Sequence, residues 1–276
     1  MYRGRLEALY GVWDFIKTSD ADYVVLSDCD VVANVDFSPI VDSHISSGAD
    51  ITAVYANDVV TVEQAQKATV FGINDEGRVV DVLTNPYISG ACNVSLNMFV
   101  LSKEFLKNLV LEANSRGLVS FEKDILQART HDYKIMGYRF DGYFSKITSM
   151  DTFYKANMNL LNTENRNKLF IANRPIYTKV RDNPPAKFGI GAKVKNSLIG
   201  DGCIIEGTVE NSVLFRGVKV GKGAVVKNCI LMQDTHVGAK CEVSCVISDK
   251  NVKIGDMRML TGSENYPLYL GKGAEI

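Results

Sequence analysis

The feature that most constrains the fold is a repeat in the C-terminal part of the chain. Three tetrads share one pattern and a shortened fourth copy follows them: Val194-Lys195-Asn196-Ser197, Val209-Glu210-Asn211-Ser212, Val226-Lys227-Asn228-Cys229 and Val243-Ser244-Cys245. The leading valines are 15, 17 and 17 residues apart. A near-constant period of this kind indicates a solenoid of stacked coils, in which each coil buries its apolar residues against the next.

Glycine dyads between the tetrads support the same interpretation. Each consists of an aliphatic residue and a glycine: Ile190-Gly191, Ile199-Gly200, Val220-Gly221, Val237-Gly238 and Ile254-Gly255. We therefore predict a left-handed parallel β-helix with hexapeptide-type turns over residues 187–276. We expect the four valines to form one internal column. Residues 257–276 are expected to cap the last coil or to dock on a neighbouring subunit, because a solenoid end otherwise leaves apolar residues exposed.

The N-terminal part has a different pattern, in which strands alternate with helices. Residues 6–19 have apolar side chains at helical spacing, and the apolar run that ends near residue 27 is typical of a buried strand. This alternation predicts an α/β sandwich on a mainly parallel sheet. We expect this domain over residues 1–163, followed by a linker rich in proline and polar residues over 164–186.

Composition excludes several classes of protein. The chain is 46% hydrophobic and 23% charged with a net charge of −1, so no nucleic-acid or membrane-surface partner is indicated. No apolar run reaches the roughly 20 residues that span a bilayer, and the N-terminus has no apolar signal core. The six cysteines then indicate free thiols of a cytoplasmic protein. Cys241 and Cys245 favour buried apolar packing over a zinc site, and His236 favours a solvated corner over an acyltransferase base.

Three acids follow the strand at residues 24–26, namely Asp28, Asp30 and Asp36. The carboxyl ends of strands are where open α/β sheets bind their ligands. Asp30 is the best candidate for a Mg²⁺ ligand, because Mg²⁺ takes oxygen ligands and bridges substrate phosphates. A helix-capping or turn role explains Asp28 or Asp36 equally well. The sequence contains neither a P-loop nor a dinucleotide-binding fingerprint.

Six segments, taken in order, resemble bacterial ADP-glucose pyrophosphorylase (glucose-1-phosphate adenylyltransferase), and in particular its regulatory-type second subunit. They are YRGRLEALYGVWDFI, VVLSDCDVVANVDF, FEKDIL, GYFSKITSMDTFYKANMNLL, RPIYTKVRDNPPAKF and NSLIGDGCIIEGTVENSVLFRGVKVG. The resemblance implies a nucleotidyltransferase domain with a Rossmann-like sheet and a C-terminal left-handed β-helix. It also implies synthesis of ADP-glucose and pyrophosphate from ATP and glucose 1-phosphate with Mg²⁺, in an allosterically controlled tetramer.

Carried over residue by residue, the resemblance departs from the family at the active site. The chain starts downstream of the place where the family has its glycine-rich GGxGTRL loop, so we expect an N-terminal truncation. Asp30 occupies a metal-binding position and Ser95 a sugar-contacting one, with Asn97 in place of a glycine. Asn85 stands where the family has the lysine that binds the sugar phosphate, and Lys146 where it has the second metal-binding aspartate.

The substitutions predict a remnant site, in which Asp30 and Lys146 form an internal ion pair and Mg²⁺, expected for the family, need not bind. The resulting hypothesis is a regulatory subunit for glycogen biosynthesis that joins a catalytic paralogous subunit in a hetero-oligomer and binds sugar phosphates or nucleotides. A homo-oligomer in isolation stays open. Two alternatives are a catalytically active sugar-phosphate nucleotidyltransferase and a sugar-phosphate-sensing scaffold.

Overall fold

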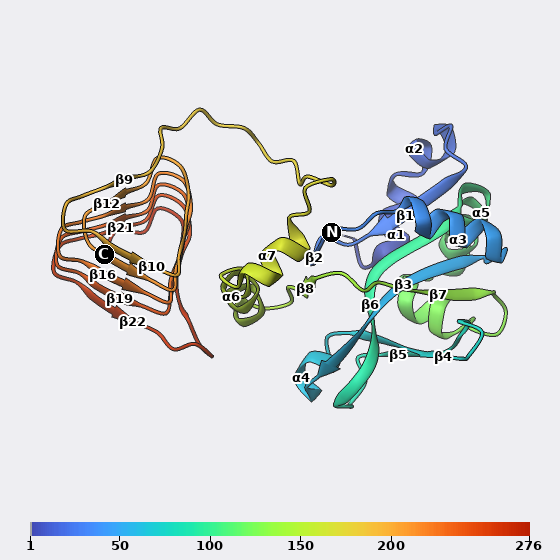
Figure 1. Ribbon diagram of the computed structural model, residues 1–276. Coiled ribbons are helices and arrows are strands. Elements are labelled where there is room, and N and C mark those ends of the chain that lie inside the picture. The colour runs from blue at the N-terminus through green and yellow to red at the C-terminus, as the bar shows by residue number, and fades with distance from the viewer. Residues whose placement is uncertain (1) are drawn as a thin grey trace. The chain divides into compact units, whose positions relative to one another are not determined.

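A computed structural model describes residues 2–276, which form two compact units (Figure 1). The first unit contains the chain up to Val31 together with Val35–Gly142, and the second contains Val32–Asn34 and Tyr143–Ile276. This division differs from the predicted boundary at residue 163. Helices α6 (Met150–Asn159) and α7 (Thr163–Leu169) belong to the second unit, where Tyr154 of α6 packs on Ile230 and Ile247 of the solenoid.

The first unit is built on a six-stranded sheet in which β1 pairs with β6 and the remaining strands follow the order β5-β4-β6-β3-β7. The strands are β1 (Tyr23–Ser27), β3 (Ile51–Val60), β4 (Thr69–Ile73), β5 (Val79–Thr84), β6 (Gly90–Ser102) and β7 (Ile135–Arg139). The prediction of a mainly parallel sheet was wrong, since only β3 and β7 pair in parallel. The long strand β6 runs antiparallel to β1, β3 and β4, and β4 and β5 form a hairpin, whose short turn requires antiparallel strands.

Helices cover this sheet and supply much of the core. They are α1 (Arg5–Gly11), α2 (Trp13–Thr18), α3 (Ser38–Ser47), α4 (Val62–Ala65), α5 (Lys103–Arg116) and the π-helix η1 (Phe121–Gln127). The single helix predicted over residues 6–19 is two helices, because the backbone leaves helical geometry at Val12. Helix α5 ends at Gly117, and the φ of 67° there suits glycine.

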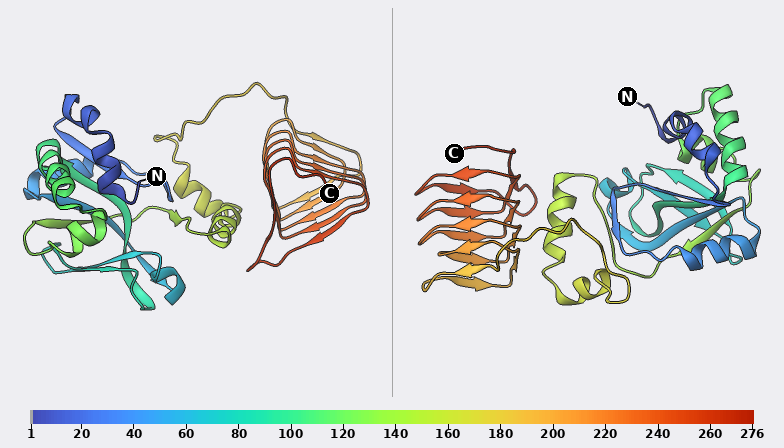
Figure 2. Two further views of the ribbon diagram at one scale, coloured as in Figure 1. Left: turned by 180° about the vertical axis from the view of Figure 1, so that it is seen from behind. Right: turned by 90° about the horizontal axis from the view of Figure 1, so that it is seen from above.

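The second unit contains the predicted parallel β-helix, made of three five-stranded parallel sheets (Figure 2). The first sheet contains β10 (Lys193–Lys195), β13 (Thr208–Glu210), β16 (Val225–Lys227), β19 (Glu242–Ser244) and β22 (Met259–Thr261). The second contains β11 (Leu198–Ile199), β14 (Val213–Leu214), β17 (Ile230–Leu231), β20 (Val246–Ser248) and β23 (Leu268–Leu270). The third contains β9 (Lys187–Phe188), β12 (Ile204–Ile205), β15 (Lys219–Val220), β18 (His236–Val237) and β21 (Lys253–Ile254).

The predicted valine column is confirmed. Val194, Val209, Val226 and Val243 are register partners in successive coils, and Leu260 continues the column. The valines at 209, 226 and 243 are fully buried, whereas Val194, in the first coil, is 39% exposed. The repeat in the sequence is therefore the period of one buried column.

The asparagine of each tetrad lies at a corner of the coil where the backbone is left-handed. Asn196, Asn211 and Asn228 have φ values of 44°, 46° and 51°, a left-handed conformation that asparagine tolerates better than most residues. Cys245 occupies the equivalent corner in the next coil, with a φ of 51°. The glycine of the dyad at Gly221 is required for another reason, since a Cβ there would lie 2.8 Å from the backbone of the following coil.

The C-terminal segment, predicted to cap the last coil or to dock on another subunit, is built into the solenoid. Strand β22 pairs with β19 and β23 pairs with β20, so residues after 257 form a further coil. Leu260 and Leu270 extend the apolar interior, which explains why the segment continues the solenoid. Met257, Met259 and Tyr266 remain exposed, and docking of this segment on another subunit stays a prediction.

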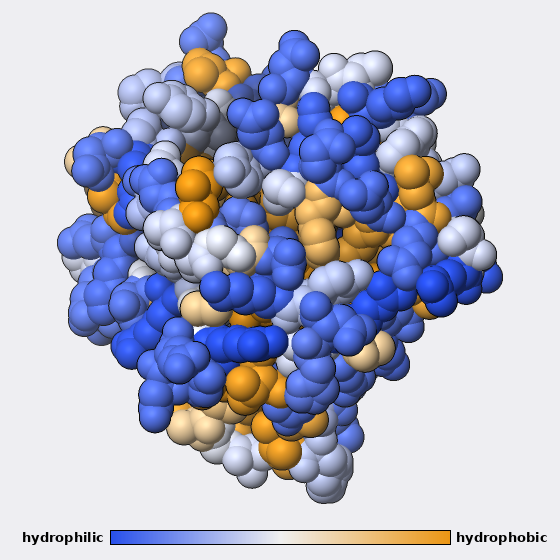
Figure 3. All heavy atoms as spheres, turned by 90° about the vertical axis from the view of Figure 1, so that its right-hand side faces the viewer, coloured by the Kyte–Doolittle hydropathy of each residue, from blue (hydrophilic) through white to orange (hydrophobic). Residues whose placement is uncertain are grey.

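Three further observations concern the chain as a whole. Within residues 2–276, no helix is both long and apolar enough to cross a membrane. All six cysteines are free thiols, as predicted. On the face of the molecule seen in Figure 3, apolar residues gather in patches interrupted by polar ones.

Candidate functional site

The candidate site lies in the first unit, at the carboxyl end of β1. Strand β1 pairs with β6 up to Ser27 and Met98, which places Asp28 and Asp30 beside the middle of β6. The backbone N–H of Asp28 donates to the carbonyl of Asn97 at 3.4 Å. The strand end predicted to carry the functional acids therefore does carry them, next to the segment that contains Ser95 and Asn97.

An arginine from the first helix neutralises one of these acids. Arg5 Nη2 lies 2.5 Å from Asp28 Oδ2, and Arg5 Nη1 lies 2.9 Å from Glu122 Oε1 in η1. The guanidinium group also lies 5.2 Å from the ring centroid of Phe99 and 5.6 Å from that of Phe121. Its side chain is only 15% exposed, so solvent competes little with these contacts. The carboxylate of Asp28 is consequently occupied by a cation that belongs to the chain itself.

Asp30 lies in a second group of contacts, with the two predicted site residues of β6. Asn97 Nδ2 lies 3.5 Å from Asp30 Oδ2, at the long end of hydrogen-bond distances. The backbone N–H of Asn97 donates to Ser95 Oγ at 3.1 Å, and Ser95 is fully buried. The pairing of β3 with β6 is interrupted opposite residues 96 and 97, and Asn97 has a φ of 55°. This bulge explains a glycine or asparagine at position 97, since both tolerate the left-handed conformation.

The other two predicted positions come from different strands, directly after β5 and at the end of β8 (Phe144–Lys146). Asn85 follows β5 directly, is exposed, has a φ of 54° and donates its backbone N–H to Ala68. Strand β4 separates β5 from β6, so Asn85 is not on the strand that carries Ser95. Lys146 ends β8, which pairs with β2 (Val31–Ala33) in the second unit. Its ion pair with Asp30 stays a prediction.

Both acids at this edge of the sheet have partners within the chain. Among residues 2–276, no three or more histidine, cysteine, aspartate or glutamate side chains are grouped so that they could hold a metal ion. Mg²⁺ requires near-octahedral oxygen ligands, usually with one or two carboxylates. Here the carboxylate of Asp28 is paired with Arg5, and that of Asp30 faces the amide of Asn97. The chain supplies its own positive charge and hydrogen-bond donor to this edge of the sheet.

Sequence reasoning missed Arg5, Glu122 and the two phenylalanines around the guanidinium. The segments that contain Arg5 and Glu122 belong to the resemblance, but neither residue stands out by its type or spacing. Their contacts join residues more than twenty positions apart, and Glu122 lies in a π-helix that the apolar pattern does not predict. No local signal in the sequence identifies this group.

Comparison with known proteins adds independent information. Residues 184–264 match the family model described as GlmU-like, C-terminal hexapeptide. The chain is 33% identical over 260 residues to the glycogen biosynthesis protein GlgD of Bacillus subtilis, covering 94% of this chain and 65% of that protein. It is 30% identical over 241 residues to a glucose-1-phosphate adenylyltransferase of Clostridium perfringens, covering 86% and 61%, respectively. It is 31% identical over 229 residues to the enzyme of that name from Geobacillus stearothermophilus, covering 82% and 59%. The chain thus spans between 59% and 65% of the length of these relatives.

Proposed function

The chain belongs to the family of GlgD and the glucose-1-phosphate adenylyltransferases, and from that premise we propose that it is a regulatory subunit in glycogen biosynthesis. In this proposal it joins a catalytic paralogous subunit, which converts ATP and glucose 1-phosphate into ADP-glucose and pyrophosphate. The chain itself contributes little or no turnover. It contributes assembly, through its β-helix, and a sheet edge that binds sugar phosphates or nucleotides.

The observation that carries this proposal is the pairing of Arg5 with Asp28 at the end of β1. Nucleotidyl transfer develops negative charge on the phosphates, and metal ions or basic side chains must stabilise it. A carboxylate that is already bound to a guanidinium group is a poor ligand for a second cation, because the first must be displaced. The carboxylate of Asp28 is therefore committed to a partner within the chain.

The residues at two substituted positions also support a loss of turnover. The neutral amide of Asn85 cannot replace the charge of a lysine on a sugar phosphate, and the ammonium group of Lys146 repels a divalent cation at an aspartate position. Loss of one preorganised electrostatic partner costs on the order of 10²–10³ in rate, although two losses need not be additive. Lys146 can still contact a phosphate as a point charge, which supports binding without turnover.

The proposal is tested by reconstitution. Pyrophosphate release from ATP and glucose 1-phosphate is measured for this chain alone, for a catalytic paralogue alone and for the two co-purified. We expect no turnover by this chain, and a changed effector response or KM of the paralogue when both are present. Turnover by this chain alone would establish the active-enzyme alternative, and an unchanged paralogue that does not co-purify with it would refute the regulatory role.

A further inference from the structure

The second unit contains a cavity that the proposed function does not use. It has a volume of about 580 Å³ and lies between α6 with its C-terminal turn and one corner of the solenoid. This volume is within the range of about 300–1,000 Å³ that is typical of small-molecule sites. The lining residues are Tyr154, Lys155, Met158, Asn159, Leu161, Asn162, Asn196, Asn211, Asn228, Glu264 and Asn265.

The helix wall of the cavity is held firmly. Tyr154 is 4% exposed, packs on Ile230 and Ile247, and donates its hydroxyl to the carbonyl of Asn228 at 2.8 Å. At the start of α6, Ser149 and Thr152 form a reciprocal capping box. The contacts of Tyr154 fix α6 against the coils, and the capping box fixes the first turn of the helix. The cavity therefore exists without a ligand, and little ordering is needed for binding.

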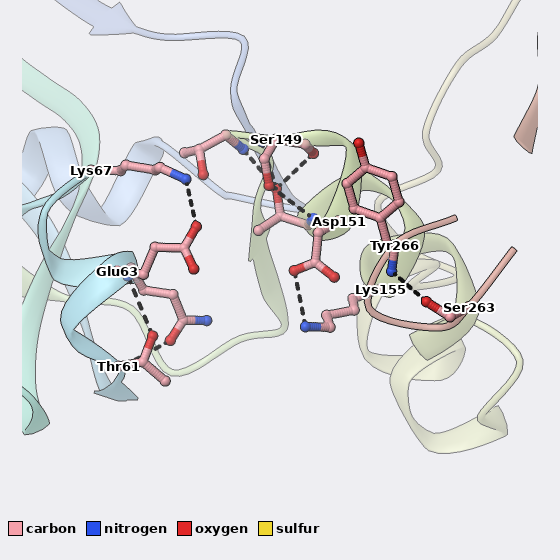
Figure 4. A network of polar contacts seen from close by, with 11 residues as sticks. Thr61, Glu63, Lys67, Ser149, Asp151, Lys155, Ser263 and Tyr266 are labelled. Carbon is pink, nitrogen blue, oxygen red and sulfur yellow. Dashed lines mark hydrogen bonds and ion pairs between the residues drawn. The ribbon is translucent and has the colours of Figure 1, made fainter. Parts of the chain in front are cut away.

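An insertion in the repeat forms a further wall of the cavity. At this corner, the earlier coils join the first sheet to the second with one or two residues, such as Asn228-Cys229 or the single Cys245. The last coil instead uses residues 262–267, in which Ser263 and Tyr266 close a turn by reciprocal backbone hydrogen bonds. The backbone N–H of Tyr266 also donates to Ser263 Oγ (Figure 4). Glu264 and Asn265 form the tip of that turn and line the cavity. Insertions in repeat proteins often lie on the face that binds a ligand.

The chemistry of the lining is that of neutral amides. Six of the eleven lining residues are asparagines, and each amide offers two N–H donors and an acceptor oxygen with two lone pairs. Asn196 Nδ2 donates to Asn211 Oδ1 at 2.8 Å, which uses one donor of Asn196 and one lone pair of Asn211. The two charged lining residues have opposite signs, and Lys155 is already paired with Asp151 at 2.9 Å (Figure 4).

We propose that this cavity binds a neutral polyhydroxylated molecule, a sugar or a short oligosaccharide without phosphate. Each hydroxyl group of a sugar both donates and accepts hydrogen bonds, as each amide does. Phosphate groups accept only and are bound by arginine or lysine clusters, which this lining lacks. The side chains of Met158 and Leu161 supply an apolar surface for the C–H face of a sugar ring. The inference does not depend on the catalytic state of the first unit.

The test uses maltotriose as the neutral probe and glucose 1-phosphate and inorganic phosphate as charged probes. Binding to the whole chain is measured by calorimetry and by saturation-transfer NMR. The double variant Asn211→Gly/Asn228→Gly removes two amides and keeps the left-handed corners, because glycine adopts positive φ freely. Asn159→Trp fills the cavity from the exposed side of α6. Asn251→Gly is the matched control, a left-handed asparagine of the same solenoid that does not line the cavity.

We expect saturable maltotriose binding that weakens at least about tenfold in the double variant and in Asn159→Trp, because each lost hydrogen bond and each steric overlap removes binding free energy. Asn251→Gly should bind as the wild type does, and the charged probes should bind no more tightly than maltotriose. Three results would each overturn the proposal. They are absence of saturable maltotriose binding, equal weakening in the Asn251→Gly control, and tighter binding of the phosphate-bearing probes at the same residues.

Discussion

The solenoid and the α/β unit solve the same problem, burial of apolar side chains, in opposite ways. In the solenoid, Val209, Val226 and Val243 have nearly identical surroundings, because each coil repeats the contacts of its neighbour. In the α/β unit, the contacts of Arg5 do not repeat a pattern. They come from the end of β1, from β6 and from η1, which lie far apart in the sequence. The solenoid is therefore specified by a local period, and the candidate site by a single long-range arrangement.

The largest effect is expected where the repeat is broken. Val226→Asp places a carboxylate in the middle of the buried valine column, where the neighbouring side chains of the column are apolar and cannot pair with it. We expect a loss of about 3–5 kcal/mol in the free energy of unfolding of the solenoid. The neighbouring Val225→Asp is the control, because successive strand residues point to opposite faces. Thermal unfolding followed by circular dichroism measures both, and equal losses in the two variants would contradict the column.

A smaller effect is expected where the single long-range arrangement is broken. Arg5→Met leaves the carboxylates of Asp28 and Glu122 without their cation, which we expect to cost about 1–3 kcal/mol, discounted for the partial exposure of Asp28. Addition of Asp28→Asn should recover part of the loss, because one uncompensated charge is removed. Denaturant unfolding measures the double-mutant cycle, and strict additivity of the two changes would show that the pair does not interact.

The left-handed corners give a third, still smaller effect. Asn228→Ala forces an ordinary side chain to adopt a φ of 51° and should cost about 1–2 kcal/mol, whereas Asn228→Gly should cost clearly less. The same two substitutions at Asn211 should reproduce the difference, because the corner repeats. Melting temperatures of the four variants decide the matter, and an alanine variant as stable as the glycine one would argue against conformational strain at the corner.

The smallest effect is a pH dependence confined to the α/β unit. Burial lowers the pKa of His44, partly opposed by Asp50, and His44 Nδ1 lies 2.9 Å from Thr52 Oγ1. Because the unfolded chain then takes up a proton more readily than the folded one, stability falls as the pH drops below about 6.5 toward the lowered value. His44→Gln should remove this slope while the acid-induced loss at lower pH persists. A slope unchanged in His44→Gln would assign it to other groups.

The same contrast explains what could be predicted from the sequence. The valine column and the coils follow from spacing alone, since a period is visible without any knowledge of distant contacts. The stop of α5 at Gly117 and the hairpin of β4 and β5 follow from local turn chemistry. The direction of β6 does not, because an apolar run is the same in parallel and antiparallel sheets, and pairing is decided by the connections.

The candidate site was predicted in part, and its limits have the same origin. The resemblance located Asp30, Ser95 and Asn97, which the structure brings together. It also placed Asn85 and Lys146 with them; the strand order puts Asn85 beyond β4, and the ion pair of Lys146 with Asp30 stays a prediction. Arg5 could not be found at all, because its role arises only when α1, β1 and η1 meet.

The acids at the end of β1 are committed to partners within the chain. Titration of the chain with Mn²⁺, followed by electron paramagnetic resonance of the free ion, tests this commitment, with Asp30→Asn and Asp28→Asn as site variants. We expect the wild type and both variants to bind Mn²⁺ alike, with no saturable site that depends on these two acids. Saturable Mn²⁺ binding by the wild type that is lost in Asp30→Asn would contradict it, and would show that the edge of this sheet is still a metal site.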